Sequence, residues 1–231
     1  MQAIVVADNQ EDRDFLNFVL RHAGVAVATT AALQPVTATL AERPVDLVLL
    51  SLPESGRLLP DIEALRLVTQ VPVVALMGML TEELHCALLD AGVDLVLPRP
   101  FSARVLSRYV RILLRRSRTV PASVLPRFET DTILLDPTTR TVTVSGCDPQ
   151  RLTQLEFRLF YLLVSNQNQV LPADMIVERV WGYSGQGNRE LVRGLIRRLR
   201  RKIETPSASQ RFIQNIPGVG YRFSTDAPAD S

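Results

Sequence analysis

The segment 189–202 concentrates positive charge. It holds seven basic side chains and one acid, Glu190, which gives it a net charge of +6, whereas all 231 residues together have a net charge of only +2. Guanidinium groups at this density suit the phosphates of a nucleic acid, and arginine can also bind guanine through two hydrogen bonds. An ordinary solvated helix is the plainer alternative, but seven like charges in 14 residues repel one another and favour a polyanionic partner. The seven are Arg189, Arg193, Arg197, Arg198, Arg200, Arg201 and Lys202.

Other kinds of chemistry find little support in the sequence. The cysteines, Cys86 and Cys147, and the histidines, His22 and His85, are too far apart to have the spacing of metal ligands or of a disulfide framework. No glycine-rich phosphate loop and no nucleophile with a matching base is present. We therefore expect no metal, no cofactor and no enzymatic activity. The apolar run 71–80 is about half of a membrane span, and no secretory signal begins the chain, so we expect a cytoplasmic protein without membrane contact.

The basic segment has the period of an amphipathic helix over 189–203. Its apolar residues recur every three or four positions and predict one buried stripe, with Arg193, Arg197 and Arg200 together on another face and the other basic residues flanking them. The apolar residues are Val192, Leu195, Ile196, Leu199 and Ile203.

The elements around this helix predict a small α+β domain over 128–225. Thr153 and Glu156 form a capping box at the start of a helix that ends near Asn166. A glycine-rich loop spans 182–188, and the turn at 217–219 joins two strands into a terminal hairpin that can act as a wing. The remaining predicted elements are β-rich runs at 132–137 and 140–146, a helix at 173–181, and hairpin strands at 212–216 and 220–223.

The first half of the chain, residues 1–116, alternates short apolar runs with helical patterns. Continuous apolar strands separated by helices indicate a parallel sheet covered on both faces, so we predict a doubly wound α/β domain. Residues 117–127 contain two prolines and no apolar period, and we interpret them as a linker. The predicted strands are 4–7, 25–27, 47–50, 71–77 and 95–97, and the predicted helices are 11–23, 31–42, 60–70, 81–91 and 102–116.

Four ordered strings in the second half carry a specific resemblance: LTQLEFRL at 152–159, VERVWG at 177–182, IRRLRRKI at 196–203 and GVGYRF at 218–223. This region resembles the winged-helix effector domain of OmpR/PhoB-type response regulators. The resemblance implies promoter DNA as the partner, helix 189–203 in the major groove, and a preceding four-stranded platform. In the hairpin that can act as a wing, Arg222 either contacts phosphate or serves as a plain sheet residue. The resemblance also implies a loop facing RNA polymerase. The loop residues are Trp181, Tyr183 and Gln186.

The resemblance is not complete in the recognition helix and the wing. Arg193 stands where the family usually has aspartate, Leu195 where histidine is common, and Pro217 where a wing arginine is frequent. These departures concern the preferred DNA sequence and not DNA binding itself.

The first half is similar to a response-regulator receiver, with supporting strings at 45–50, 91–94 and 99–101. Its pocket should lie at the carboxyl ends of the strands. There Ala7 removes one acid of the metal-binding pair, and Ser51 replaces the acceptor aspartate, with no base apparent beside it. Aspartyl phosphorylation and tight Mg²⁺ binding are therefore not expected, and a cognate histidine kinase is doubtful. The pocket residues are Asp8, Asn9, Ser51, Met77 and Arg99.

Several expectations follow for this receiver-like domain. We expect Asp8 to cap the first helix or to pair with Arg99, which would hold the pocket in one state. The family also implies a cis peptide before Pro100 and a homodimer through the fourth helix, fifth strand and fifth helix, bound to paired direct repeats. The alternatives are a receiver that senses a ligand or partner, one modified on Ser51, and a flavodoxin-like nucleotide-binding enzyme. Candidate dimer residues are Glu82, Glu83, Asp94, Arg104, Arg108 and Arg111.

Overall fold

A computed structural model describes residues 1–40, 44–116, 125–183, 189–204 and 212–225. The chain forms two compact units, residues 1–118 and 119–231. The predicted linker, 117–127, falls at this division, and residues 117–124 of it lie outside the described residues. No helix among the described segments is long and apolar enough to cross a membrane.

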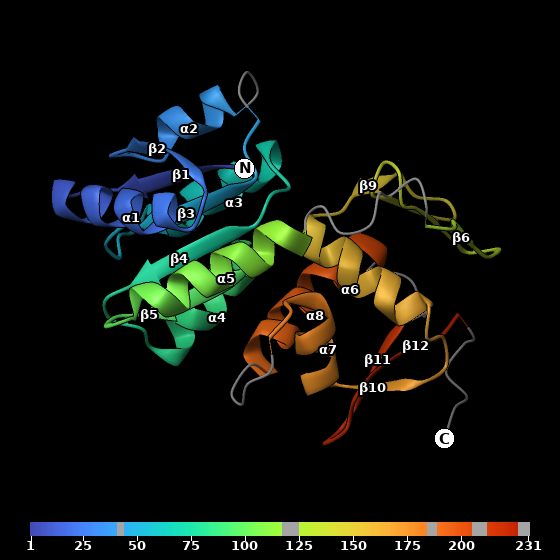
Figure 1. Ribbon diagram of the computed structural model, residues 1–231. Coiled ribbons are helices and arrows are strands. Elements are labelled where there is room, and N and C mark those ends of the chain that lie inside the picture. The colour runs from blue at the N-terminus through green and yellow to red at the C-terminus, as the bar shows by residue number, and fades with distance from the viewer. Residues whose placement is uncertain (41–43, 117–124, 184–188, 205–211, 226–231) are drawn as a thin grey trace. The chain divides into compact units, whose positions relative to one another are not determined.

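The first unit is built on a parallel sheet of five strands, as predicted, and their spatial order is β2-β1-β3-β4-β5 (Figure 1). The strands β3 and β4 are buried along their whole length, because helices cover both faces of the sheet. The strands are β1 (Gln2–Ala7), β2 (Ala26–Thr30), β3 (Leu47–Ser51), β4 (Val73–Met77) and β5 (Leu95–Pro98).

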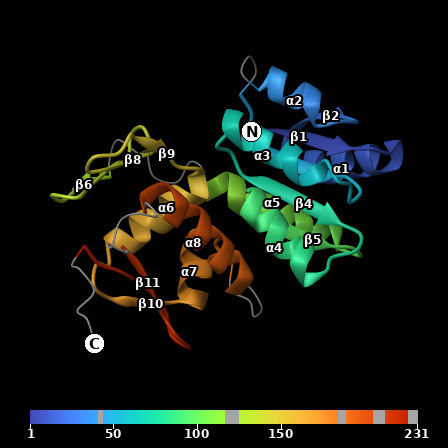
Figure 2. The same ribbon diagram turned by 180° about the vertical axis from the view of Figure 1, so that it is seen from behind.

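Helices alternate with these strands. Helix α1 packs against α5, whereas α3 packs against both α2 and α4, so the sheet lies between two helical layers (Figures 1 and 2). The peptide between Arg99 and Pro100 is cis, as the family resemblance implies. The helices are α1 (Gln10–His22), α2 (Gln34–Thr39), α3 (Leu58–Val68), α4 (Glu82–Ala91) and α5 (Ala103–Arg116).

The second unit begins with an antiparallel sheet of four strands in the order β6-β7-β8-β9. Three helices follow, and each packs against the other two. The capping box at Thr153 and Glu156 starts the first of them, as predicted. These elements are β6 (Phe128–Glu129), β7 (Ile133–Asp136), β8 (Thr141–Val144), β9 (Gln150–Arg151), α6 (Gln154–Val164), α7 (Ala173–Val180) and α8 (Arg189–Ile203).

A second antiparallel sheet closes this unit, with β10 (Val170–Pro172), β12 (Gly220–Phe223) and β11 (Ile213–Ile216) in that spatial order. The β11–β12 hairpin is the predicted wing. Phe223 at its end is fully buried, and its ring contacts Phe160 of α6 at 5.6 Å and Phe128 of β6 at 5.9 Å between centroids. One aromatic side chain therefore connects the wing, the helices and the four-stranded sheet, which is the winged-helix arrangement that the sequence predicts.

Candidate nucleic-acid interface and strand-end pocket

Helix α8 exposes one row of arginines. Arg189, Arg193, Arg197 and Arg201 are all exposed and follow one another at four-residue steps, so they lie along one side of the helix. We call these four residues the arginine stripe. The opposite side buries the predicted apolar residues, from Val192 to Ile203. A continuous exposed row of guanidinium groups is suited to a phosphate-lined groove.

Two other basic residues of α8 do not share this face. Arg198 is 5% exposed, and its Nε lies 3.8 Å from Oε1 of the buried Glu156. The Lys202 ammonium donates to Oε2 of the same carboxylate at 2.7 Å and to the carbonyl of Arg151 at 2.8 Å. The expectation that Arg198 flanks an exposed basic face is therefore wrong, because Glu156 pairs with it inside the unit. Lys202 is half-buried in the same cluster.

Glu156 thus has two roles. Its carboxylate accepts from the backbone N–H of Thr153 at 2.8 Å, which completes the capping box of α6, and it also holds the two cations of α8. Burial by itself raises the pKa of Glu156, but the charges of Arg198 and Lys202, together with the hydrogen bonds from Lys202 and Thr153, outweigh it and lower the pKa below 4.5. The cluster fixes α8 against α6 through buried, paired charges.

Arg200 and Arg222 also have partners within the protein. Arg200 donates to the carbonyl of Ile213 at 2.7 Å and lies 3.7 Å from the carboxylate of Glu204, so it is partly buried and not on the exposed face predicted for it. Arg222 donates to Oε1 of Gln214, its neighbour across the hairpin, at 2.7 and 3.1 Å. This contact favours the plain sheet reading of Arg222 over the phosphate contact.

The three residues expected to face RNA polymerase differ in how the structure places them. Trp181 is 1% exposed and belongs to the core of the second unit, so its expected place on a protein-facing loop is wrong. Tyr183 is half-buried, and Gln186 lies outside the described residues.

At the carboxyl ends of the strands of the first unit, an arginine, a serine and an aspartate meet. Arg99 donates to Oδ2 of Asp12 at 2.5 Å and to Oγ of Ser51 at 2.8 Å, and Ser51 donates to the same Asp12 oxygen at 2.6 Å. The guanidinium of Arg99 also lies 5.3 Å from the centre of the Phe101 ring. We call Asp12, Ser51 and Arg99 the pocket triad.

The triad corrects two expectations. Asp8 neither caps α1 nor pairs with Arg99. Asn9 is the cap, because its side chain accepts from the backbone N–H of Asp12 at 2.7 Å, and Asp12 is the partner of Arg99. A carboxylate does lie beside Ser51, although the sequence suggested none. Asp8 is exposed and accepts from the backbone N–H of Asn9 at 2.9 Å.

The residues at this pocket do not fit Mg²⁺. Besides Arg99, the guanidinium of Arg13 donates to the carbonyls of Ala7 at 2.5 Å and Asp8 at 3.0 Å, so two cations occupy the region where hard oxygen ligands would be needed. Met77 is buried and supplies no hydroxyl. Among the described residues, no group of three His, Cys, Asp or Glu side chains is arranged to hold a metal.

Asp12 has a shifted pKa. Burial raises it, but the hydrogen bonds from Ser51 and Arg99 and the charge of Arg99 outweigh this effect, so the net pKa lies below 3.8. Asp12 is therefore ionised at neutral pH, and its carboxylate accepts hydrogen bonds from both Ser51 and Arg99. Sequence reasoning missed Asp12, and its only signal was a position in the first turn of α1, where acidic residues are ordinary.

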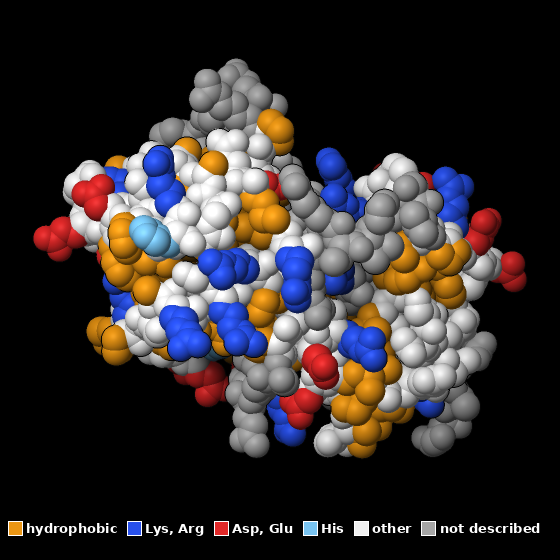
Figure 3. Space-filling view, viewed as in Figure 1, with side chains coloured by type: hydrophobic (Ala, Val, Ile, Leu, Met, Phe, Trp, Pro, Cys, Tyr) orange, Lys and Arg blue, Asp and Glu red, His pale blue; other side chains and the backbone are white. Residues whose placement is uncertain are grey.

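The candidate dimer residues fall into three groups. Glu82, Glu83, Arg104 and Arg108 are exposed. Arg111 is also exposed and donates to the carbonyls of His22 and Ala23 at 3.3 and 3.4 Å. Asp94 is 2% exposed, pairs with Arg66 and accepts from the N–H of Val73 at 2.9 Å, so its expected pairing across a dimer axis is wrong. Figure 3 shows basic side chains gathered over α5.

The fold and the arginine stripe define a DNA-binding regulator with a receiver-like first unit. Residues 148–223 match the family described as "Transcriptional regulatory protein, C terminal". The KDP operon transcriptional regulatory protein KdpE of Escherichia coli is 33% identical over 222 residues, which cover 95% of this chain and 97% of KdpE. The DNA-binding response regulator MtrA of Mycobacterium leprae is 34% identical, with 95% of this chain and 96% of MtrA covered. The chain belongs to the OmpR/PhoB family of DNA-binding response regulators.

The solved structures agree with the fold. A mutant of RitR superposes with a TM-score of 0.78 at 21% identity, over 96% of this chain and 98% of that one. At this identity the likeness concerns the fold alone.

Proposed function

We propose that this protein regulates transcription by binding promoter DNA as a homodimer on direct repeats, without aspartyl phosphorylation. The arginine stripe of α8 supports the DNA partner, because its four side chains are exposed along one side of a helix whose other side is packed. The names of KdpE and MtrA point to the same class of function. RNA polymerase is the second partner that the family resemblance implies.

The pocket triad carries the proposal of phosphorylation independence. Transfer of a phosphoryl group needs a carboxylate nucleophile and a divalent cation to neutralise charge. At this pocket the carboxylate of Asp12 is already paired with Arg99, the acceptor position is the 5% exposed Ser51, and guanidinium groups occupy the place of a metal. Arg99 supplies permanently the positive charge that other receivers would obtain from a bound metal, so we infer that the receiver stays in one state.

Footprinting of the unmodified full chain on genomic promoter fragments tests the DNA partner and the dimer together. We expect protection of paired direct repeats with no phosphodonor present. Protection of single, unpaired sites would remove the direct-repeat dimer from the proposal, and no protection at any salt concentration would remove the DNA partner.

A phosphate analogue tests the phosphorylation claim separately. The full chain is titrated with beryllium fluoride in the presence of Mg²⁺, and its mass is followed by light scattering. We expect no saturable change in oligomeric state or in DNA affinity. A tight, saturable response that shifts the dimer equilibrium would show that the pocket still accepts a phosphoryl group.

A further inference from the structure

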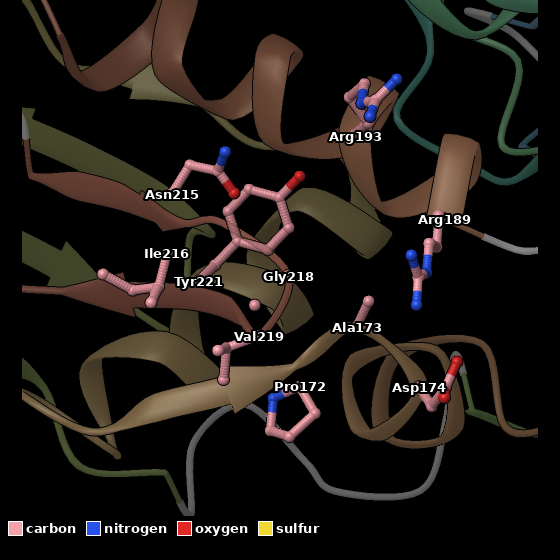
Figure 4. A pocket seen from close by; sticks show the side chains of 11 residues that line it. Pro172, Ala173, Asp174, Arg189, Arg193, Asn215, Ile216, Gly218, Val219 and Tyr221 are labelled. Atoms are coloured by element: carbon pink, nitrogen blue, oxygen red, sulfur yellow. The ribbon is translucent and has the colours of Figure 1, made fainter.

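A hollow of about 330 Å³ in the second unit lies between α8, the start of α7 and the β11–β12 hairpin (Figure 4). Arg189 and Arg193 of the arginine stripe line it, so the hollow is part of the surface proposed to bind DNA. Helix α1 of the first unit exposes a different surface, and DNA binding gives that surface no role.

Two phenylalanine rings of α1 face solvent. Phe15 is 42% exposed and Phe18 is 62% exposed, and a step of three residues places them on the same face of the helix. The Phe15 ring contacts that of Phe101 at 6.3 Å, and the Phe18 ring contacts that of His22 at 4.1 Å between centroids. Figure 3 shows hydrophobic side chains beside a histidine over α1. More than half of Phe18 remains in water, so its burial by a partner would stabilise a complex.

Charged side chains flank the two rings, and their signs are separated along the helix. The acids Glu11 and Asp14 lie toward the start of α1, whereas Arg21 and His22 lie at its end, and all four are exposed. None of the four forms an ion pair within the described residues. Arg111 of α5 adds a second guanidinium at the same end, because it donates to the carbonyl of His22 at 3.3 Å. The helix dipole favours this order of charges, but it does not account for the exposed rings between them.

This face is complementary to itself under a two-fold rotation. When two copies of α1 lie antiparallel, with the axis midway between Phe15 and Phe18, the Phe15 of each copy meets the Phe18 of the other. Glu11 lies four positions before Phe15, and His22 lies four positions after Phe18. Each Glu11 therefore faces the His22 of the other copy, and the rings form an apolar centre between these contacts.

Asp14 and Arg21 complete the match. They are seven positions apart, which is two helical turns, so they lie on the same side of α1. In the antiparallel arrangement the Asp14 of each copy lies beside the Arg21 of the other. A partner with one sign of charge would instead meet like charge at one end of the face. The pattern thus favours a second copy of this chain over an acidic or a basic partner.

We propose that two copies of the chain associate through α1, antiparallel about a two-fold axis between Phe15 and Phe18. The four rings supply the apolar contact, and the Asp14–Arg21 pairs determine the orientation. The proposal rests on the proposed function, because it assigns the homodimer of that function to the α1 face and not to α4, β5 and α5.

Phe18→Asp tests the apolar centre. Sedimentation velocity of the full chain over a range of concentrations, with no phosphodonor, gives the dissociation constant of the dimer. We expect Phe18→Asp to raise this constant on the order of a hundredfold, because the substitution places a carboxylate in both halves of the apolar centre. Amide hydrogen exchange in β1 and β3 checks that the first unit stays folded. The matched control is Leu67→Asp, which changes an 86% exposed leucine on α3 and should dimerise like the unchanged protein.

Charge reversal tests the orientation. Asp14→Arg and Arg21→Asp each place like charges opposite one another in both halves of the dimer, so each should weaken association by about tenfold. An equal mixture of the two variants should recover the affinity of the unchanged protein, because position 14 of one chain then faces an opposite charge at position 21 of the other. Absence of recovery in the mixture would overturn the antiparallel arrangement.

Glu83→Arg separates the α1 face from the face that the family resemblance implies. Glu83 is exposed on α4, and its reversal should leave an α1 dimer intact. If Glu83→Arg dissociates the dimer and Phe18→Asp does not, the α1 proposal is overturned and the homodimer of the proposed function stands. If neither variant dissociates it, the α1 face is open to a different protein and its assignment to a second copy is overturned. If the unchanged chain is monomeric at every concentration and on paired direct repeats, the homodimer of the proposed function fails as well.

Discussion

Each unit contains an arginine held by a carboxylate, and the two clusters differ in burial and in consequence. In the second unit, Glu156 and Arg198 are 2% and 6% exposed in their side chains, and they lie beneath the arginine stripe. In the first unit, the side chains of Asp12 and Arg99 are 19% and 33% exposed. The buried cluster holds α8 against α6, whereas the partly exposed one lies at the carboxyl ends of the strands, where we expect the pocket of a receiver.

The difference shows that an arginine in a functional region need not be a functional contact. Arg197 and Arg198 are adjacent in sequence, yet one is exposed on the stripe and the other is buried against α6. Ion pairs in these two settings also have different energies, because removing one member of a buried pair leaves a charge without compensation, whereas an exposed pair is screened by water. The predictions below test this contrast.

The largest effect is expected for Glu156→Gln. It leaves Arg198 as a buried cation without a carboxylate and weakens the α6–α8 contact, so we expect a loss on the order of 3–5 kcal/mol in the free energy of unfolding of the second unit. Trp181 is the one tryptophan of the chain and is buried in this unit, so its fluorescence during urea unfolding measures the change. The exposed Glu178→Gln on α7 is the control and should unfold like the unchanged protein.

The second prediction contrasts two neighbours on α8. We expect Arg197, which is exposed on the stripe, to contact a base edge, so Arg197→Ala should cost about 1–3 kcal/mol in affinity for the preferred DNA site and relax sequence preference. Its unfolding midpoint should stay unchanged. Arg198→Ala should instead lower the unfolding midpoint, since it leaves the Glu156 carboxylate buried beside Lys202 alone. The reverse pattern would show that the two side chains have been assigned to the wrong environments.

The third and smaller effect concerns the pocket triad. Arg99→Ala removes two hydrogen bonds and an ion pair that water partly screens, so we expect a loss of about 1 kcal/mol in the stability of the first unit. Amide hydrogen exchange in β1 and β3 measures it, because the first unit contains no tryptophan. Arg104→Ala on the exposed face of α5 is the control. A loss of stability as large as that expected for Glu156→Gln would show that the two clusters contribute equally to the free energy of unfolding of their units, whatever their burial.

The sequence predicts the helices and strands that carry both clusters better than it predicts which side chains pair within them. The alternation of strands and helices in the first unit and the capping box at Thr153 follow from local patterns, because period and cap chemistry act within a few residues. The pairing of Arg99 with Asp12 spans 87 positions, and nothing local distinguishes Asp12 from the neighbouring acids Asp8 and Glu11. That choice is made by the packing of α1 on the sheet.

Arg198 is an intermediate case. It lies seven positions after Leu191 and three after Leu195, so the helical period places it on the buried side of α8. Charge alone suggested exposure, and the period suggested burial. A buried carboxylate on a neighbouring helix makes burial of Arg198 possible, and the capping box places Glu156 at the start of such a helix. Combining the two signals would have predicted the pair.

The smallest predicted effect is a difference in acid sensitivity. The pKa of Asp12 is lowered in the folded state, so the stability contributed by its contacts is complete above the unfolded value of 3.8 and is lost as pH falls through the lower folded value. Because the carboxylate is partly exposed, we expect less than about 1 kcal/mol to be lost from the first unit over this range. Hydrogen exchange of β1 and β3 as a function of pH measures the loss.

Asp12→Asn separates this contribution from general acid unfolding. The variant cannot titrate at this position, so its first unit should be less stable at neutral pH and should show a weaker dependence on pH below 4 than the unchanged protein. Glu156 obeys the same sign around its own unfolded value of 4.5, but it acts on the second unit and is read by Trp181. Equal acid dependence of the first unit in Asp12→Asn and in the unchanged protein would show that the triad contributes nothing through the charge of Asp12, and Arg99 would then be held by its hydrogen bond to Ser51 and its contact with Phe101.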